Sequence, residues 1–468
     1  MVQLTLEIAG ENNKSLVFCY YVSGHGWGHA TRANQIISDI LKLPANHTVY
    51  VISNASEFIF RGVTAVGAIY RQADIDAGVV QPLAYTVDRS QTIANLKHFI
   101  ERRPKILAAE IDWLKQVKAD CVVCDAPFLP CAAATGARIP SAIASNFTFD
   151  EVYTGLCEGD EIDDEIYDLV EKVVADYRNA DLLVRLPGAI RIPSFNDTEP
   201  LVPATPITGT FSEYKSVVNG MINIPSVSIS NVPSSKPTVN LPSYERTIVD
   251  VPLVFRKYHN DRETVLSDLN IPKHIYETHK VLLLSFGGQN LGEGDWSKTL
   301  PDKWICIVCG TPASVNLPPG FYRAPRDAYV PDLTNAADVV LGKLGYGTCS
   351  ECIGHRTPFV YVSRPQFVEE CGLLKLMKDQ GSVVELSRQD FEAGIWAETI
   401  EEASKLSGHC SDPSRSVTYN GGIVVAKLLE KFAHNWEILA QSRNSISEVN
   451  DTLQQIQQSS ASNNIRAQ

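Results

Sequence analysis

The sequence lacks a surplus of positive charge. Its 54 Asp and Glu residues outnumber its 41 Lys and Arg residues, which gives a formal net charge of −13 at pH 7. An acidic chain repels polyanions, so DNA, RNA and anionic membrane surfaces are not expected as main partners. A small anionic ligand is still compatible with this charge, because a few backbone N–H groups can hold a phosphate whatever the global balance.

Long apolar runs are also missing. No window approaches the ~18 uninterrupted apolar residues that a membrane-spanning helix needs. The first fifteen residues, MVQLTLEIAGENNKS, contain Glu7 and no apolar segment behind a basic start, so they do not resemble a secretory signal. The eleven cysteines, an odd number, fit a reducing compartment. These features predict a cytoplasmic protein with no integral membrane segment.

Three C-x-x-C pairs have the spacing of a zinc or redox site, namely Cys121/Cys124, Cys306/Cys309 and Cys349/Cys352. The first two pairs lie in short β-rich runs, ADCVVCDA and WICIVCG. In a strand, residues i and i+3 point to opposite faces, so neither pair can bind one metal ion. We therefore expect buried structural thiols, and no metal or other cofactor.

The chain is about three times the ~150 residues of a typical domain, so two or three cores are expected. From residue 15 to about 186, and again from 280, β-like runs alternate with longer helical stretches. This alternation predicts an α/β protein with two doubly wound parallel sheets, that is, two Rossmann-like domains. The stretch 187–247 is instead rich in Pro, Ser, Thr and Asn and has no helical period, which is typical of a connection with an insertion.

The elements can be placed from these patterns. We expect strands of the first domain at 15–22, 47–53, 67–73, 120–125, 141–145 and 181–186, and strands of the second within the runs 280–288, 304–310, 338–347, 358–363 and 382–386. Expected helices lie at about 29–43, 55–62, 91–117, 127–137, 161–179, 261–269, 331–336, 348–355, 367–379, 393–406 and 420–441. The predicted domain boundaries are 1–190, a linker and insertion over 191–250, 251–418, a helix over 419–442 that packs back, and a polar tail over 443–468.

A glycine- and histidine-rich turn, SGHGWGHATR, spans residues 23–32 between an expected strand and an expected helix. Such glycines permit tight turns and close approach of the backbone to another molecule. The dinucleotide fingerprint G-x-G-x-x-G is not matched, because the third glycine comes one position early. The run after the next strand also begins with Asn54 instead of the ribose-binding acid. NAD is therefore not expected.

The two histidines of this turn add chemistry. A histidine at the carboxyl end of a strand, with an ordinary pKa near ~6.5, can act as a general base around neutral pH. His29 begins the helix, and Arg32 lies one turn along it, so the two side chains can share a face. A hydrogen-bonded structural histidine is the alternative. Metal binding by His25 and His29 is less expected, because no third ligand is evident.

A second glycine cluster lies in LGKLGYGTCSECIGH, where Gly342, Gly345 and Gly347 follow an expected strand. Thr348 is a candidate N-cap of the next helix, and free N–H groups at a helix start attract phosphate. Glu351, near the first turn, could accept hydrogen bonds from ribose hydroxyls or merely favour the helix dipole.

Two further segments could reach the same cleft. SFGGQN places Gly287 and Gly288 after the first strand of the second domain, and FVEE presents Glu369 and Glu370, which suit sugar hydroxyls unless they are simply exposed. Glycine turns at the carboxyl ends of strands in both halves lie where ligands of doubly wound sheets bind. Two facing clefts suggest two substrates.

Several motifs resemble a known family when they are taken in order. GHGWGHATR, NFTFDEVY, RLPGAIRIPSF, VDVPLV, FGGQ, LGKLGYGTCSE and FVEE are similar to the amino-terminal glycosyltransferase-like region of plant L-arabinokinases and its stand-alone relatives. The resemblance covers about 15–432 and is interrupted near 197–247. More distantly, the two glycine motifs resemble those of the bacterial N-acetylglucosaminyltransferase that builds the lipid-linked cell-wall precursor.

The resemblance implies a GT-B fold, a nucleotide sugar (commonly a UDP sugar) in the carboxyl domain, an unknown acceptor in the amino domain, and no catalytic metal. It places His29 at the position often proposed as the base, and the nucleobase near Tyr329 and Val330. Implied donor-binding residues are Gly287, Gly288, Gln289, Tyr329, Val330, Lys343, Gly345, Gly347, Thr348, Ser350, Glu351, Glu369 and Glu370. Implied acceptor-side residues are Gly24, His25, Gly26, Gly28, Arg32, Asp125 and Asn146.

Arabinokinases carry their kinase chemistry in a following sugar-kinase domain, and no such segment is found in these 468 residues. Kinase activity is therefore not expected. The sequence predicts a metal-independent glycosyltransferase. Two alternatives stay open: a module that binds a nucleotide sugar without transferring it, and a nucleotide-sugar epimerase of the same shape.

Overall fold

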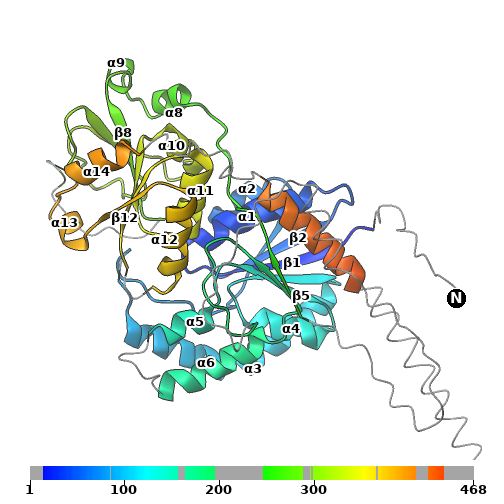
Figure 1. The fold of residues 1–468 in the computed structure, drawn as a ribbon. Helices are drawn as coiled ribbons and strands as arrows, with labels where there is room; N and C mark the ends of the chain where they lie inside the picture. Colours follow the sequence, from blue (N-terminus) through cyan, green and yellow to red (C-terminus); the bar gives the residue numbers. More distant parts are fainter. Residues whose placement is uncertain are drawn as a thin grey trace, which may run out of the picture.

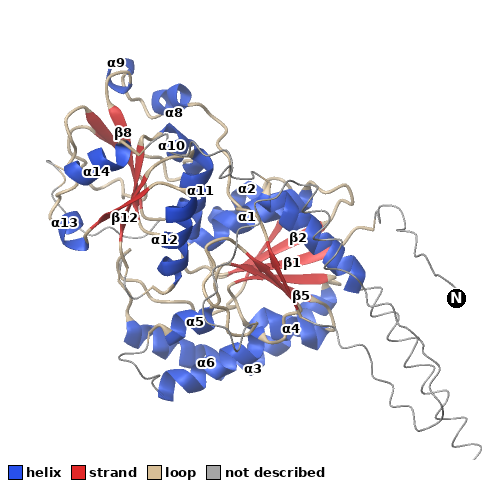
Figure 2. Ribbon diagram, in the orientation of Figure 1, coloured by secondary structure: helices blue, strands red, loops and turns tan. Residues whose placement is uncertain are grey.

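A computed structural model describes residues 14–84, 86–156, 164–195, 246–287, 296, 299–364, 367–406 and 420–436. The chain forms two α/β lobes that lie side by side (Figure 1). In each lobe the strands form a central sheet and the helices lie outside it (Figure 2). Two doubly wound domains, as predicted from the alternation of elements, are therefore present.

The first lobe has a seven-stranded sheet of order β3-β2-β1-β4-β5-β6-β7, in which every neighbouring pair is parallel. Its strands are β1 (Val17–Val22), β2 (Thr48–Ser53), β3 (Ile69–Gln72), β4 (Cys121–Asp125), β5 (Ser141–Ser145), β6 (Leu182–Arg185) and β7 (Thr247–Asp250). Its helices are α1 (Trp27–Leu41), η1 (Glu57–Phe60), α2 (Arg61–Thr64), α3 (Arg89–Gln116), α4 (Leu129–Ala137), α5 (Phe149–Thr154) and α6 (Asp164–Tyr177).

The two faces of this sheet have separate cores. Helix α1 packs on one face, and α3, α4 and α6 pack on the other. Residues alternate between the two cores along the central strands, as the period of a strand requires. Cys121 and Cys124 accordingly lie in opposite cores, which confirms that this pair cannot hold one metal ion. The nine cysteines for which a state is described are all free thiols.

Strand β7 comes from the segment that we placed in the linker over 191–250. It pairs in parallel with β6, and an ion pair between Arg185 and Asp250 joins the two strands, with Nε and Oδ1 2.6 Å apart. The first sheet is therefore completed by residues that follow the insertion. Most of the insertion, over 196–245, lies outside the described residues, as does the polar tail over 443–468.

The second lobe has a six-stranded parallel sheet of order β10-β9-β8-β11-β12-β13. Its strands are β8 (Lys280–Ser285), β9 (Trp304–Val308), β10 (Phe321–Arg323), β11 (Val339–Gly342), β12 (Phe359–Val362) and β13 (Val383–Leu386). Its helices are α8 (Arg262–Asp268), α9 (Lys273–Tyr276), α10 (Val330–Ala336), α11 (Tyr346–His355), α12 (Glu369–Gln380), α13 (Arg388–Glu392) and α14 (Ala397–Ser404). Helices α8, α10, α11 and α12 cover one face, and α13 and α14 the other.

The strand order reverses beside the first strand of each lobe, since β1 lies between β2 and β4, and β8 lies between β9 and β11. Such a switch point opens a crevice at the carboxyl ends of the strands, where doubly wound sheets bind ligands. The glycine turns after β1 and β11 lie at these two positions.

The chain passes between the lobes twice. The first connection follows β7, and the second leads into a final helix over 421–436, which packs on the first lobe beside α1 and β2 (Figure 1). There His47 Nε2 lies 2.9 Å from Glu430 Oε1. No helix in the part of the chain that the structure describes is long and apolar enough to span a membrane.

Candidate functional site

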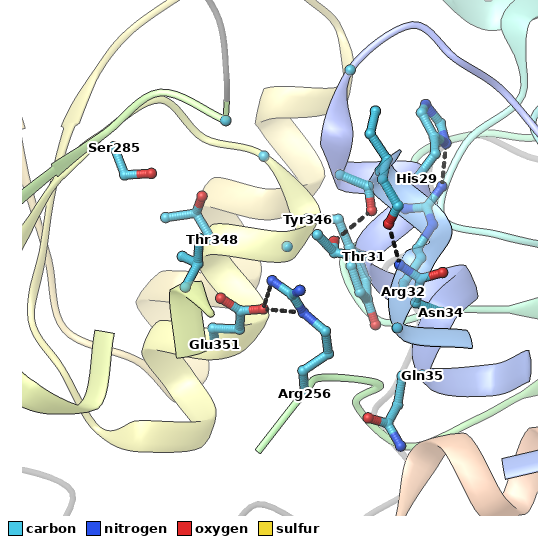
Figure 3. Close-up of a pocket in the computed structure, with 18 of the residues that line it drawn as sticks. His29, Thr31, Arg32, Asn34, Gln35, Arg256, Ser285, Tyr346, Thr348 and Glu351 are labelled. Carbon is cyan, nitrogen blue, oxygen red and sulfur yellow. Dashed lines mark hydrogen bonds and ion pairs between the residues drawn. The ribbon is translucent and has the colours of Figure 1, made fainter. Parts of the chain in front are cut away.

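A cavity of about 520 Å³ lies between the lobes. Helix α1 and the turn before it form one wall, and the loops after β8, β9 and β11 and the start of α11 form the other (Figure 3). Seven Lys and Arg residues line it against three Asp and Glu residues: Arg32, Lys42, Arg61, Arg256, Arg326, Lys343 and Arg364, and Asp327, Glu351 and Glu369. The cavity thus reverses the charge balance of the chain and favours an anionic ligand.

The turn after β1 delivers two histidines to the cavity. Gly26 is the N-cap of α1, and no side chain caps the helix start. His29 lies in the first turn of α1 and is 6% exposed, so its ring meets the cavity only at one edge. The rings of Phe147 and Phe149 lie 5.2 Å and 6.4 Å from it, between centroids.

His29 forms a pair with Asp125, the last residue of β4. His29 Nδ1 lies 3.0 Å from Asp125 Oδ1 and also 3.0 Å from the Arg32 NH2 nitrogen. That nitrogen has only two hydrogens, and both have closer acceptors, Asp125 Oδ1 at 2.5 Å and Ser145 Oγ at 2.9 Å. The proton between His29 and Asp125 therefore belongs to His29 Nδ1. The lone pair of Nε2 is then the one that a ligand in the cavity can meet.

The buried side chain of Arg32 fixes the position of the His29–Asp125 pair. Arg32 is 2% exposed, and its guanidinium donates to both carboxylate oxygens of Asp125 and to Asn146 Oδ1. Burial alone would raise the pKa of Asp125, but Arg32 and then His29 outweigh it, so that this pKa lies below its usual value. Asp125 is therefore a carboxylate whose charge is balanced by the buried Arg32.

His25 forms a second pair on the same wall. Its Nδ1 lies 3.0 Å from Oδ1 of Asp76, which is 3% exposed and follows β3. Its side chain is 30% exposed and lines the cavity. The two histidines of the motif therefore face the same space, each backed by a buried aspartate.

The opposite wall is the start of α11. Gly345, and not Thr348, is the N-cap, and it provides no side-chain cap; Thr348 lies within the first turn and lines the cavity. The first N–H groups of a helix have no intrahelical acceptor, so this end can bind an anion. A Cβ on Gly347 would lie 2.6 Å from Thr31 Oγ1 of α1, so only glycine allows the lobes to meet this closely.

Lys343 lies just before this helix start, and no ion pair or hydrogen bond joins it to another described residue. Burial, together with the nearby Arg364 guanidinium, lowers the pKa of Lys343 to about 7. A phosphate beside it would restore its full charge.

Two glutamates at the start of α12 have different partners. Glu370 accepts from Arg364 Nε at 2.6 Å and from the Arg364 backbone N–H at 2.7 Å, and it does not line the cavity. Glu369 lines the cavity and accepts from Asn146 Nδ2 of the first lobe at 3.2 Å. This hydrogen bond links the second lobe to the Arg32 and Asp125 group.

The far end of the cavity is built around Arg256 and Glu351. Arg256 NH2 lies 2.8 Å from Glu351 Oε1 (Figure 3). Beside them the rings of Tyr329 and His259 stack in parallel, 4.5 Å apart and 2° from coplanar. A flat pair of aromatic rings next to a carboxylate suits a nucleobase and a ribose.

The predicted site residues divide into three groups. Those that line the cavity are His25, Gly26, Gly28, His29, Arg32, Gly287, Tyr329, Val330, Lys343, Gly345, Gly347, Thr348, Glu351 and Glu369. Those that lie behind or beside it are Gly24, Asp125, Asn146, Ser350 and Glu370. Gly288 and Gln289 lie outside the described residues.

Our sequence reasoning missed Asp76, Arg256, His259 and Thr31. Asp76 had an available signal, because an acid that follows a parallel strand lies at the same sheet edge as the other strand ends. Arg256 and His259 lie in the loop between β7 and α8, and their direction depends on how that loop crosses between the lobes. No local pattern gives that direction.

In the part of the chain that the structure describes, no three His, Cys, Asp or Glu side chains are grouped so that they could hold a metal ion. Metal independence remains a prediction.

Comparisons with known proteins bear on the fold and the resemblance. No protein-family model matches the chain. The chain is 32% identical over 427 residues to the L-arabinokinase of Arabidopsis thaliana, which covers 90% of this chain and 35% of that protein. The resemblance predicted from the motifs is thus confirmed, and the chain spans about a third of the length of this relative.

Solved structures show the fold. CalG4, the calicheamicin glycosyltransferase, has a TM-score of 0.51 and 15% identity over 91% of this chain and 98% of that one. Medicago truncatula UGT71G1, complexed with UDP-glucose, has a TM-score of 0.51 and 14% identity over 91% and 99%. A UDP-glucosyltransferase from Polygonum tinctorium, capable of glucosylating indoxyl, has a TM-score of 0.50 and 12% identity over 91% and 100%. The chain has the GT-B fold of these glycosyltransferases.

Proposed function

We propose that the chain is a metal-independent glycosyltransferase that moves a sugar from a nucleotide sugar, a UDP sugar in the first instance, to a hydroxyl of an acceptor. One observation carries the proposal. The His29–Asp125 pair, with its proton on Nδ1, faces the uncapped start of α11 and the unpaired Lys343 across a single cavity. A base and an anion site then lie on opposite sides of the reacting sugar.

His29 supplies the base in this mechanism. Nε2 accepts the proton of the acceptor hydroxyl as its oxygen attacks the anomeric carbon, and Asp125 stabilises the imidazolium that forms. Arg32 keeps Asp125 ionised and fixed, so the ring of His29 keeps one orientation and one tautomer.

The second lobe receives the leaving diphosphate. The N–H groups at the start of α11 and the side chain of Lys343 stabilise the negative charge that grows on the departing phosphate. Protein cations and helix N–H groups then take the role that a metal ion fills in other transferases.

The nucleoside end lies by Glu351, Arg256 and Tyr329. Glu351 accepts hydrogen bonds from the ribose, for which it must share or release Arg256, and the base stacks beside Tyr329 and His259. The complex of UGT71G1 with UDP-glucose supports uridine as the first base to test.

Calorimetry with a panel of nucleotide sugars, run beside an assay for release of the free nucleoside diphosphate, tests the proposal. We expect micromolar to millimolar binding of at least one nucleotide sugar, and release of its diphosphate that depends on His29. Binding without release in the presence of many acceptors would instead favour a nucleotide-sugar-binding module. Binding of none of them would refute both.

A further inference from the structure

The pair of His25 and Asp76 has no part in the proposed mechanism, although it opens on the same cavity. Asp76 Oδ1 faces His25 Nδ1 at 3.0 Å and accepts from Asn54 Nδ2 at 3.1 Å. The other oxygen of Asp76, Oδ2, is buried and has no hydrogen-bond partner. Since Nδ1 of His25 is turned to Asp76, the opposite ring edge with Nε2 is the one that a ligand can reach.

The ring of His25 is fixed in this orientation. A Cβ on Gly78 would lie 1.9 Å from the ring, so the backbone at Gly78 closes on one side of it. Ser23 Oγ lies 3.5 Å from Nδ1 and also accepts from the backbone N–H of His25. A ring held on several sides presents its Nε2–H in one direction, which is a requirement for a binding site.

The charge around His25 differs from that around His29. No Lys or Arg in the described chain contacts Asp76, so its buried charge is balanced by His25. Asp74 adds negative charge nearby but is itself paired with Arg102, 2.7 Å away, and His29 and Tyr153 are further titratable groups near this pair. Burial alone would lower the pKa of His25, but Asp76 and then Asp74 outweigh it and raise this pKa above 6.5.

We propose that His25, held as an imidazolium by Asp76, is an anion-binding subsite for a carboxylate or phosphate group on the acceptor. This proposal rests on the proposed function, because the ligand of the subsite is an acceptor only if the chain is a glycosyltransferase. The segment around it, including Val79 and Gln81, belongs to the first lobe, whereas the groups that suit the diphosphate come from the second. A phosphate of the donor is the other possible source of the same chemistry, so the experiment must separate the two.

Sulfate is a suitable probe, because its charge does not change with pH near neutrality. We would measure its affinity for the full chain by calorimetry, alone and with saturating UDP, in the wild type and in His25→Gln, Asp76→Asn and His98→Gln. His98 is an exposed histidine on α3 and serves as the matched control, with 65% of its side chain exposed. Histidine-ring NMR, with the His25 signals assigned from His25→Gln, reports the ring directly.

With UDP bound, we expect sulfate still to bind and to shift the His25 ring signals. The His25→Gln and Asp76→Asn variants should weaken sulfate by about tenfold to a hundredfold, the size of one charge-assisted hydrogen bond. The affinity should fall as the pH rises through the raised pKa of His25, and His98→Gln should change nothing.

Two results would overturn the proposal. Displacement of sulfate from His25 by UDP would assign the subsite to the donor diphosphate. An unchanged sulfate affinity in His25→Gln would show that the pair holds no anion. Failure of UDP to bind would count against the proposed function alone, since sulfate without UDP still tests the charge of His25.

Discussion

His25 and His29 are four residues apart in one turn, and each ring lies 3.0 Å from a buried aspartate, yet the two pairs differ in charge. Besides His29, Asp125 has a charged partner, Arg32, which donates to both of its carboxylate oxygens. Besides His25, Asp76 accepts a hydrogen bond from Asn54, whose side chain is neutral. The carboxylate of the first pair is therefore balanced by a cation other than its histidine, whereas the carboxylate of the second depends on its histidine.

The comparison shows that the further partner of the aspartate, a cation in one pair and a neutral amide in the other, decides what a histidine–aspartate pair does. A balanced carboxylate leaves the imidazole free to take a proton from a substrate. An unbalanced one keeps a proton on the imidazole and turns it into a fixed cation. The motif GHGWGH supplies both residues, and their different roles come from the strands and helices that back them.

Removal of His29 should have the largest effect on the rate. We expect His29→Ala to lower kcat by about 10² to 10⁴, the usual worth of a general base. The affinity for UDP should stay unchanged, because the anion site belongs to the second lobe. Rates of diphosphate release and UDP calorimetry measure the two quantities. Undiminished turnover in His29→Ala would remove His29 from the mechanism.

Removal of Arg32 should leave the aspartate of the His29–Asp125 pair without a further cation, as in the His25–Asp76 pair. Arg32→Met leaves Asp125 buried and unbalanced, which should destabilise the fold by about 3–5 kcal/mol. It should also loosen the orientation of the Asp125 carboxylate and with it that of the His29 ring, so that activity falls. Denaturant unfolding and a pH–rate profile measure both effects.

The double variant Arg32→Met with Asp125→Asn removes both charges and should regain part of the lost stability, though not the activity. Lys273→Met breaks an exposed ion pair with Glu263 and should leave the stability almost unchanged. Equal losses in Lys273→Met and Arg32→Met would show that burial of the charge does not matter.

Lys343 extends the comparison to a cation that forms no ion pair with a carboxylate in the described chain, although Glu369 and Glu370 lie near enough to favour its charged form. Because its pKa is lowered to about 7, the free protein holds this proton below pH 7 and loses it above. A bound diphosphate should restore the proton, so UDP affinity should fall, and proton uptake on binding should rise, as the pH increases from 6 to 8. Calorimetry in buffers of different ionisation enthalpy measures the uptake.

The variant Lys343→Met should weaken UDP by about tenfold, from the loss of one charge-assisted hydrogen bond, and should abolish the proton uptake. Uptake that persists in Lys343→Met would assign the proton to another group.

The smallest effect concerns the stability that the second pair contributes. The pKa of His25 is raised in the folded state, so its contribution is fully present below pH 6.5 and is lost as the pH rises through the raised value. His25→Gln should therefore lower the free energy of unfolding by under about 1 kcal/mol at pH 6, because the side chain is 30% exposed. The difference from wild type should shrink at pH 9. A difference that grows with pH would reverse the assigned charge.

Much of the fold could be predicted because buried parallel strands are continuous apolar runs. The strands missed by the sequence reasoning are β7 and β10, of four and three residues, which lie at the edges of their sheets. Edge strands bury fewer side chains, so their apolar signal is weak. The expected helix at 393–406 is observed as α14, which begins after the buried Trp396, and the short helix α13 before it was not predicted.

The site was predictable where backbone geometry demands particular residues. Glycines at the carboxyl ends of β1 and β11 mark both walls of the cavity. The pairings behind the walls were not predictable, since Arg32 with Asp125 and His25 with Asp76 join residues 93 and 51 positions apart (125 − 32 and 76 − 25). Such contacts depend on the order of strands in the sheet, which the motifs do not contain.

The placement of β7 has a practical consequence for building shorter forms of this protein. Arg246, at the entrance to β7, donates to the carbonyl of Ser194 at 2.5 Å and to that of Ala180 at 2.7 Å. Ser194 and Arg246, which flank the insertion, are therefore neighbours at one rim of the first sheet. A short glycine-containing turn could bridge them directly, and reporter domains could be spliced in at the same place without touching either histidine pair.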